Sequence, residues 1–140
     1  MRARSPGHSA TVPGGGGEVT GLAPDAAIPA DMRVGVVSGA DEMRDASRYL
    51  FQHGVDFLKL IATGAVLAEG TEPGAIELSE DEMVAAVGVA RQYGSYATAH
   101  AHGAEGIRSA IRGTIDPRRA KISSSGPGVS RTIIRPSGWP

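Results

Sequence analysis

The chain has 140 residues, and its 14 basic and 15 acidic side chains give a net charge of −1. This balance excludes a general binder of nucleic acid or anionic membranes, because no overall positive field attracts polyanions. With 41% hydrophobic and 21% charged residues, the composition is that of a soluble globular protein of at most one domain. The absence of cysteine excludes disulfides, thiolate nucleophiles and thiolate metal sites. Since no apolar segment has the pattern of a signal peptide or a membrane span, we expect a cytoplasmic protein.

Glycine and proline divide the chain into three parts. Residues 1–31 are rich in both and show no period, which predicts a loop segment. Its glycine run at 14–17 predicts flexibility, because the strand and the Lys-Ser/Thr pair of a phosphate-binding loop are missing. Residues 32–113 carry the periodic patterns of an ordered domain. Residues 114–140 contain no acidic residue after Asp116, and we expect them to form a disordered basic tail.

The middle part predicts a helix, a strand and a second helix in succession. Ser38, followed three residues later by Asp41, indicates the start of a helix over 39–53. The nearly continuous apolar run at 56–62 is typical of a strand covered on both faces in a parallel sheet. Ser79 begins the sequence Ser-Glu-Asp-Glu, a capping box that predicts the start of the next helix.

A second buried strand is predicted over 96–101, and a third helix over 104–112. A strand, a capped crossover helix and another strand form a right-handed βαβ unit, which leaves doubly wound sheets and barrels both open. The long connection at 63–78 follows the C-terminal end of the first strand, where such folds place active sites, so it is a candidate substrate loop. Its acidic residues are interpreted as a polar lid, namely Glu69, Glu72 and Glu77.

Lys59 is the charged residue in the centre of an otherwise apolar strand. With a period of two residues it shares a face with Phe57 and Ile61. Desolvation lowers the pKa of a lysine, and the neutral amine can then act as a nucleophile, including toward carbon dioxide. The alternative is a lysine near the strand end whose ammonium group extends to water.

His100 and His102 lie two residues apart at the end of the second strand. If the strand persists, both lie on one face, where they suit a shared metal or a ligand plus a substrate contact. The alternative is that His102 has already turned into the loop before Gly103 and that neither histidine binds anything. His53 stands at a predicted helix C-terminus, where a cation is favourable, and is interpreted as structural.

Four motifs in the middle part carry a resemblance to a known family, and they span about Leu22 to Gly113. They are G-V-D-F-L-K-L-I-A-T-G-A-V, E-P-G-A, L-S-E-D-E and A-H-A-H-G-A-E-G-I. Together they resemble the amidohydrolase superfamily of metal-dependent hydrolases. Within it, the chain is similar to the branch of imidazolonepropionase-like proteins and Xaa-Pro dipeptidases (prolidases).

The resemblance implies a (β/α)₈ TIM barrel with one or two divalent metal ions, often zinc, at the C-terminal ends of the strands. It makes Lys59 on the fourth strand a carbamylated lysine that bridges the metals, and His100 on the fifth strand a metal ligand. His102 becomes a substrate contact. The implied reaction is hydrolysis of a C–N bond by metal-activated water, in an amide, an N-acyl amino acid or an Xaa-Pro dipeptide.

The chain departs from the family at both ends. The His-x-His motif of the first strand is absent, as are the Glu-His pair of the sixth strand and the Asp of the eighth strand. We therefore expect an α/β chain that forms part of a barrel, about strands three or four to five, inactive alone and holding metal only in the complete protein. A frameshifted or truncated gene near codon 114 is our hypothesis for this departure.

One alternative from a different class of protein is kept. A non-enzymatic α/β module could bind a partner through the open sheet edges of an unclosed barrel, and it predicts a stable, monodisperse fold without metal. A fragment of a broken barrel is instead expected to self-associate through the same edges. The basic tail has one aromatic residue, Trp139, and no period, so we expect no nucleic-acid partner and no membrane partner.

Overall fold

The computed structural model describes residues 4–23, 25–66, 68–114 and 131–133. Most of the predicted tail, 114–140, therefore lies outside the described residues. The elements, in chain order, are β1 (Ser9–Ala10), a short 3-10 helix (Ala30–Arg33), α1 (Ala40–Gln52), β2 (Leu58–Ile61), α2 (Glu80–Gln92), β3 (Ala97–His100), α3 (Ala104–Thr114) and β4 (Arg131–Ile133). In the described part of the chain, no helix has the length and apolarity needed to cross a membrane.

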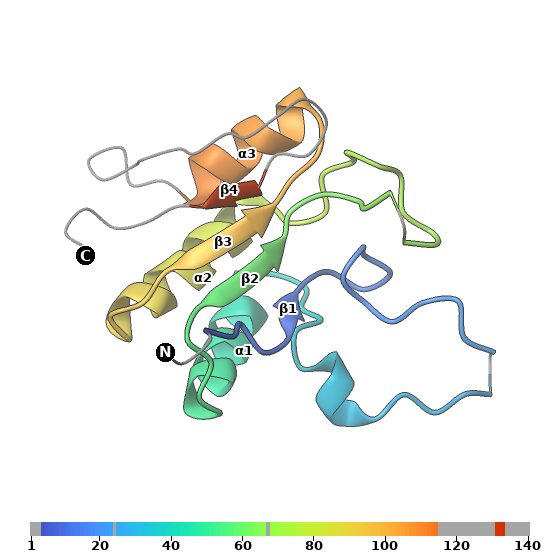
Figure 1. Cartoon of the computed structure of the whole chain (residues 1–140), viewed down its shortest axis with the longest axis horizontal. Coiled ribbons are helices and arrows are strands. Elements are labelled where there is room, and N and C mark those ends of the chain that lie inside the picture. Colours follow the sequence, from blue (N-terminus) through green and yellow to red (C-terminus); the bar gives the residue numbers. More distant parts are fainter. Residues whose placement is uncertain (1–3, 24, 67, 115–130, 134–140) are drawn as a thin grey trace.

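The strands form one sheet in the order β1-β2-β3-β4 (Figure 1). The first three strands are parallel, and β4 runs antiparallel to β3. Helix α2 connects β2 to β3, so the predicted βαβ unit is confirmed. The predicted strands at 56–62 and 96–101 are correct in type, although each is shorter in the structure.

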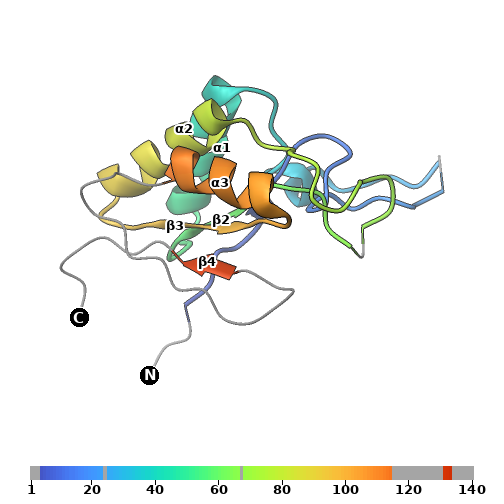
Figure 2. The same ribbon diagram turned by 90° about the horizontal axis from the view of Figure 1, so that it is seen from above.

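Helices α1, α2 and α3 all lie on one face of the sheet, and no described helix covers the other face (Figure 2). The core lies between sheet and helices. Its strand contribution is Leu58 and Leu60 of β2 with Ala97 and Ala99 of β3, all buried. Side chains alternate along a strand, so the intervening residues of both strands lie on the helix-free face.

Two segments differ from the predicted loop and tail. Ser9 and Ala10, within 1–31, form β1, which pairs with β2, and Thr11 makes a separate parallel bridge to Val36. Two residues are too few to show a period of two, so no local pattern indicates this strand. Residues 131–133, within the predicted disordered tail, form β4.

The start of α1 also differs from the prediction. Gly39, rather than Ser38, is the N-cap, and it makes no side-chain hydrogen bond as a cap. Its φ of +97° lies in the region that glycine adopts readily. The Ser38 amide donates instead to the Glu42 carboxylate at 2.8 Å.

The capping box at the start of α2 is confirmed, and it extends to a second helix. Glu82 Oε2 accepts hydrogen bonds from the Ser79 amide at 2.7 Å and the Ser79 hydroxyl at 2.8 Å. The other oxygen, Oε1, accepts from the Gly39 amide at 2.7 Å. The buried carboxylate of Glu82 therefore joins the N-termini of α1 and α2.

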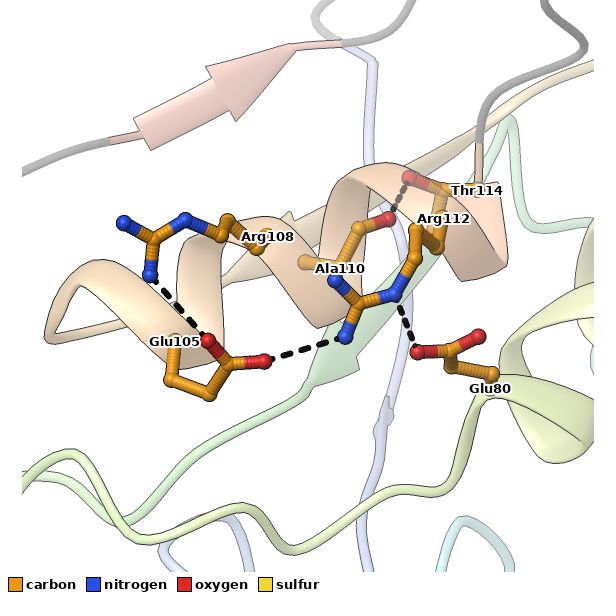
Figure 3. A network of polar contacts seen from close by, with 6 residues as sticks. All are labelled: Glu80, Glu105, Arg108, Ala110, Arg112 and Thr114. Atoms are coloured by element: carbon orange, nitrogen blue, oxygen red, sulfur yellow. Dashed lines mark hydrogen bonds and ion pairs between the residues drawn. The ribbon is translucent and has the colours of Figure 1, made fainter.

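An ion-pair network on the surface connects α3 to the start of α2 (Figure 3). Arg112 Nε donates to Glu80 at 2.5 Å, and its NH2 group donates to Glu105 at 3.1 Å. Arg108 donates to the other oxygen of Glu105 at 3.1 Å. The hydrogen bond from Arg112, with that from Arg108, lowers the pKa of Glu105, and the hydrogen bonds to Glu80 and Glu105 raise the pKa of Arg112.

Candidate functional site

Lys59 and His100 lie on the same face of the sheet, on neighbouring parallel strands. Lys59 pairs in register with Thr98, and Ile61 pairs with His100, so the two residues are offset by one strand and two positions. Both are partly buried, and both are on the helix-free face, between the positions of the core residues.

This offset brings the two side chains within reach of a common ligand. A rise of about 3.3 Å per residue and a strand spacing of about 4.8 Å put their Cα atoms about 8 Å apart. The Nε2 atom of His100 is buried. Lys59 is the second of the four residues of β2, and Leu60, Ile61 and the buried Ala62 and Thr63 follow it before the exposed part of the loop.

His102 has left the strand but remains next to His100. Strand β3 ends at His100, yet the two imidazole rings contact edge to face with centroids 4.5 Å apart. The His102 amide donates to the Thr63 hydroxyl at 2.8 Å. The structure therefore brings together all three predicted site residues, and His53 lies apart from them as the C-cap of α1.

Three of the four glycines at 14–17 lie close to other residues, whereas Gly14 has open space around it. The flexibility of the run stays a prediction. A Cβ on Gly16 would lie 2.9 Å from the Ala65 amide nitrogen, and one on Gly17 would lie 2.8 Å from Ile61 Cγ1. These glycines allow the loop to approach the C-terminal end of β2 closely. A run of glycine alone does not distinguish a flexible segment from such a close approach.

Glu77, which the sequence assigns to a polar lid, accepts hydrogen bonds from this glycine loop. Both carboxylate oxygens of Glu77 accept a hydrogen bond from the Gly16 amide at 3.0 Å. The Glu77 amide donates to the Ala62 carbonyl at 3.0 Å. Glu77 thus connects the loop after β2 to the loop after β1.

The donors present fit part of a metal centre. A lysine, once carbamylated, and an imidazole on adjacent strands can share a zinc ion, but a catalytic zinc site has three protein ligands. Across the described ranges, no group of three or more His, Cys, Asp or Glu residues is placed to hold a metal ion.

Comparison with known proteins decides the family. Residues 5–126 match the sequence model of the amidohydrolase family, which is most of the chain. The chain belongs to the amidohydrolase family. The match continues past residue 114, near which we predict a change of reading frame, and the frameshift stays a prediction.

Solved structures of related proteins share the arrangement of strands and helices. A Xaa-Pro dipeptidase with bound methionine is 32% identical with a TM-score of 0.66, covering 77% of this chain and 27% of its own. A prolidase complexed with N-methylphosphonate-L-proline is 29% identical with a TM-score of 0.67, covering 79% of this chain and 28% of its own.

A curated relative is ochratoxinase from Aspergillus niger, 30% identical over 77 residues. This amidohydrolase chain spans 16% of the length of ochratoxinase and about 28% of the related solved structures. The comparisons support the resemblance to prolidases. Because the chain spans only part of these relatives, an activity of the whole protein is a matter of proposal.

Proposed function

We propose that this amidohydrolase chain supplies part of the metal centre of a hydrolase that cleaves an amide or Xaa-Pro dipeptide bond. In this proposal β1, β2 and β3 correspond to the third, fourth and fifth strands of a (β/α)₈ barrel. The observation that carries it is the placement of Lys59 and His100 on one helix-free face of adjacent parallel strands, in a chain of this family. In a closed barrel that face would line the interior.

Each of the three side chains has its own role in the proposal. The neutral amine of Lys59 adds to carbon dioxide and releases a proton, which gives a carbamate whose oxygens would hold one or two zinc ions. His100 would hold zinc through an imidazole nitrogen. His102, beside it at the strand end, would contact the substrate. When bound, the metal supplies water activation and polarisation of the amide carbonyl.

Zinc binding to the purified 140-residue chain tests the ligand assignment. Only the complete protein is expected to hold the metal firmly, so zinc chloride is added in large excess to detect weak binding by the chain's own ligands. The histidine ring signals are followed by NMR. We expect the His100 signals to shift and those of His53 to stay. The variants Lys59→Ala and His100→Ala should weaken binding several-fold, whereas His53→Ala, which removes an exposed histidine on α1, should not. Equal binding by His100→Ala and the unchanged chain would contradict the assignment.

An assay with Xaa-Pro dipeptides tests the incompleteness of the site. Two donors do not fix the metal geometry of a catalytic site. We therefore expect no turnover above background from the chain alone, with or without added zinc. Hydrolysis at an enzyme-like rate would contradict this part of the proposal.

A further inference from the structure

Thr63, directly after β2, occupies an unusual position in the hydrogen-bonding between β2 and β3. The parallel ladder begins with the Leu58 amide donating to the Tyr96 carbonyl at 3.0 Å. It continues to the Ala62 amide, which donates to the His100 carbonyl at 2.9 Å. In a regular parallel ladder, the next donor would be the His102 amide and its acceptor the Ala62 carbonyl.

The ladder departs from this pattern at that step. The Ala62 carbonyl accepts instead from the returning loop, at 3.0 Å from the Glu77 amide and 3.4 Å from the Leu78 amide. The His102 amide donates to the Thr63 hydroxyl at 2.8 Å. The Thr63 hydroxyl therefore replaces the Ala62 carbonyl as the acceptor for the His102 amide. The Ala62 carbonyl is then free to accept from the end of the long loop.

The methyl group of Thr63 also fixes the start of α3. Thr63 is fully buried, and a Cβ added to Gly106 would lie 2.4 Å from Thr63 Cγ2. Since only a glycine allows this approach, the first turn of α3 rests directly on Thr63. Thr63 thus contacts the chain on both sides of the bend at Gly103, through its hydroxyl to His102 and through its methyl group to Gly106.

We infer that Thr63 is a positioning residue of the candidate site, which sets His102 against His100 by accepting the His102 amide. This inference rests on the proposed function for its relevance to catalysis, although the positioning itself is a property of the chain alone. Without the hydroxyl, the His102 amide either loses a partner in a partly buried place or competes with the loop for the Ala62 carbonyl. Either result moves the His102 ring.

The test compares Thr63→Val, which keeps the shape and removes the hydroxyl, with Thr63→Ser, which keeps the hydroxyl. Thr114→Val is the matched control, because Thr114 is also buried and its hydroxyl bonds a backbone carbonyl, that of Ala110. In the full chain, the readout is the nuclear Overhauser effect between the His100 and His102 rings, with stability measured in urea.

We expect Thr63→Val to lower the nuclear Overhauser effect between the His100 and His102 rings several-fold. Thr63→Ser and Thr114→Val should leave this effect near that of the unchanged chain. The inference would be overturned if Thr63→Val left this nuclear Overhauser effect unchanged. It would also be overturned if Thr114→Val lowered the effect equally, since such a loss would come from a general loss of packing rather than from the Thr63 hydroxyl. Titration with zinc chloride separates the two proposals. If His100→Ala binds zinc as well as the unchanged chain but Thr63→Val still separates the rings, the positioning role stands and the ligand assignment fails.

Discussion

The carboxylate of Glu82 joins two helices through its two oxygens, and Ser79 and Gly39 supply the donors. The capping box was predictable, because its two residues are three apart in sequence. The bond to Gly39 was not, because it crosses 43 positions and depends on how α1 packs on α2. The same limit applies to the site, where the local sequence singles out Lys59 and His100 but only the register of β2 against β3 shows that they share a face.

Removal of the Glu82 carboxylate should therefore be costly. The variant Glu82→Ala leaves the Ser79 and Gly39 amides without their acceptor, and we expect a loss of about 3 kcal/mol in the free energy of unfolding. Asp81→Ala, an exposed change in the same turn, should cost less than about 0.5 kcal/mol. Urea unfolding measures both. Equal losses in the two variants would show that the buried carboxylate has no special role.

The network around Glu105 predicts a dependence of stability on pH. The hydrogen bond from Arg112, with a smaller contribution from Arg108, lowers the pKa of Glu105 in the folded chain. The ion pairs of Glu105 therefore stabilise the fold fully above the pKa of the unfolded chain, near 4.5, and this stabilisation is lost as the pH falls through the folded pKa. The Tm of Glu105→Gln should be lower than that of the unchanged chain at pH 7. The difference should shrink toward acid and in high salt. A difference independent of pH would contradict the ion-pair explanation.

At the scale of elements, strands β2 and β3 and all three helices follow from local patterns, whereas β1 does not. The long apolar runs and caps of the central elements are local signals, but β1 exists only because Ser9 and Ala10 pair with Lys59 and Leu60. Thr63 was missed for a similar reason, although a glycine inside a helical pattern at position 106 is a signal of close approach.

Two glycines within helices give opposite predictions. Gly88 in α2 has open space around it, so Gly88→Ala should stabilise the chain by about 0.5–1 kcal/mol. Gly106 in α3 lies against Thr63, so Gly106→Ala should destabilise it by about 1–3 kcal/mol through overpacking. Thermal unfolding compares the two variants. Stabilisation by both would show that α3 does not rest on Thr63.

At the scale of the whole molecule, the helix-free face of the sheet is the one that would line the interior of a closed barrel. It carries stacked aromatic rings, Phe57 and Tyr96, with centroids 5.1 Å apart, beside Lys59 and Ile61. The α/β arrangement of parallel strands and helices was predictable from the local patterns and the family motifs. The covering of only one face by helices was also implied, since helices lie outside a barrel.

This face and the open edges predict self-association of the chain. Sedimentation velocity should show dimers or larger species that increase with concentration. Phe57→Ser should shift the distribution toward monomer, and Tyr49→Ser, an exposed change on α1, should not. A monomer at every concentration, with a stable fold and no zinc binding, would favour the alternative of a small non-enzymatic module.

The most direct test of the central claim is to graft residues 4–114 into the related Xaa-Pro dipeptidase in place of the segment they match. The account predicts a folded graft that binds zinc and hydrolyses Xaa-Pro dipeptides. Lys59→Ala and His100→Ala in the graft should each lower kcat/KM by about a hundredfold or more, and His53→Ala should leave it unchanged. A folded, active graft that tolerates both substitutions would contradict the claim that these strands carry part of the metal centre.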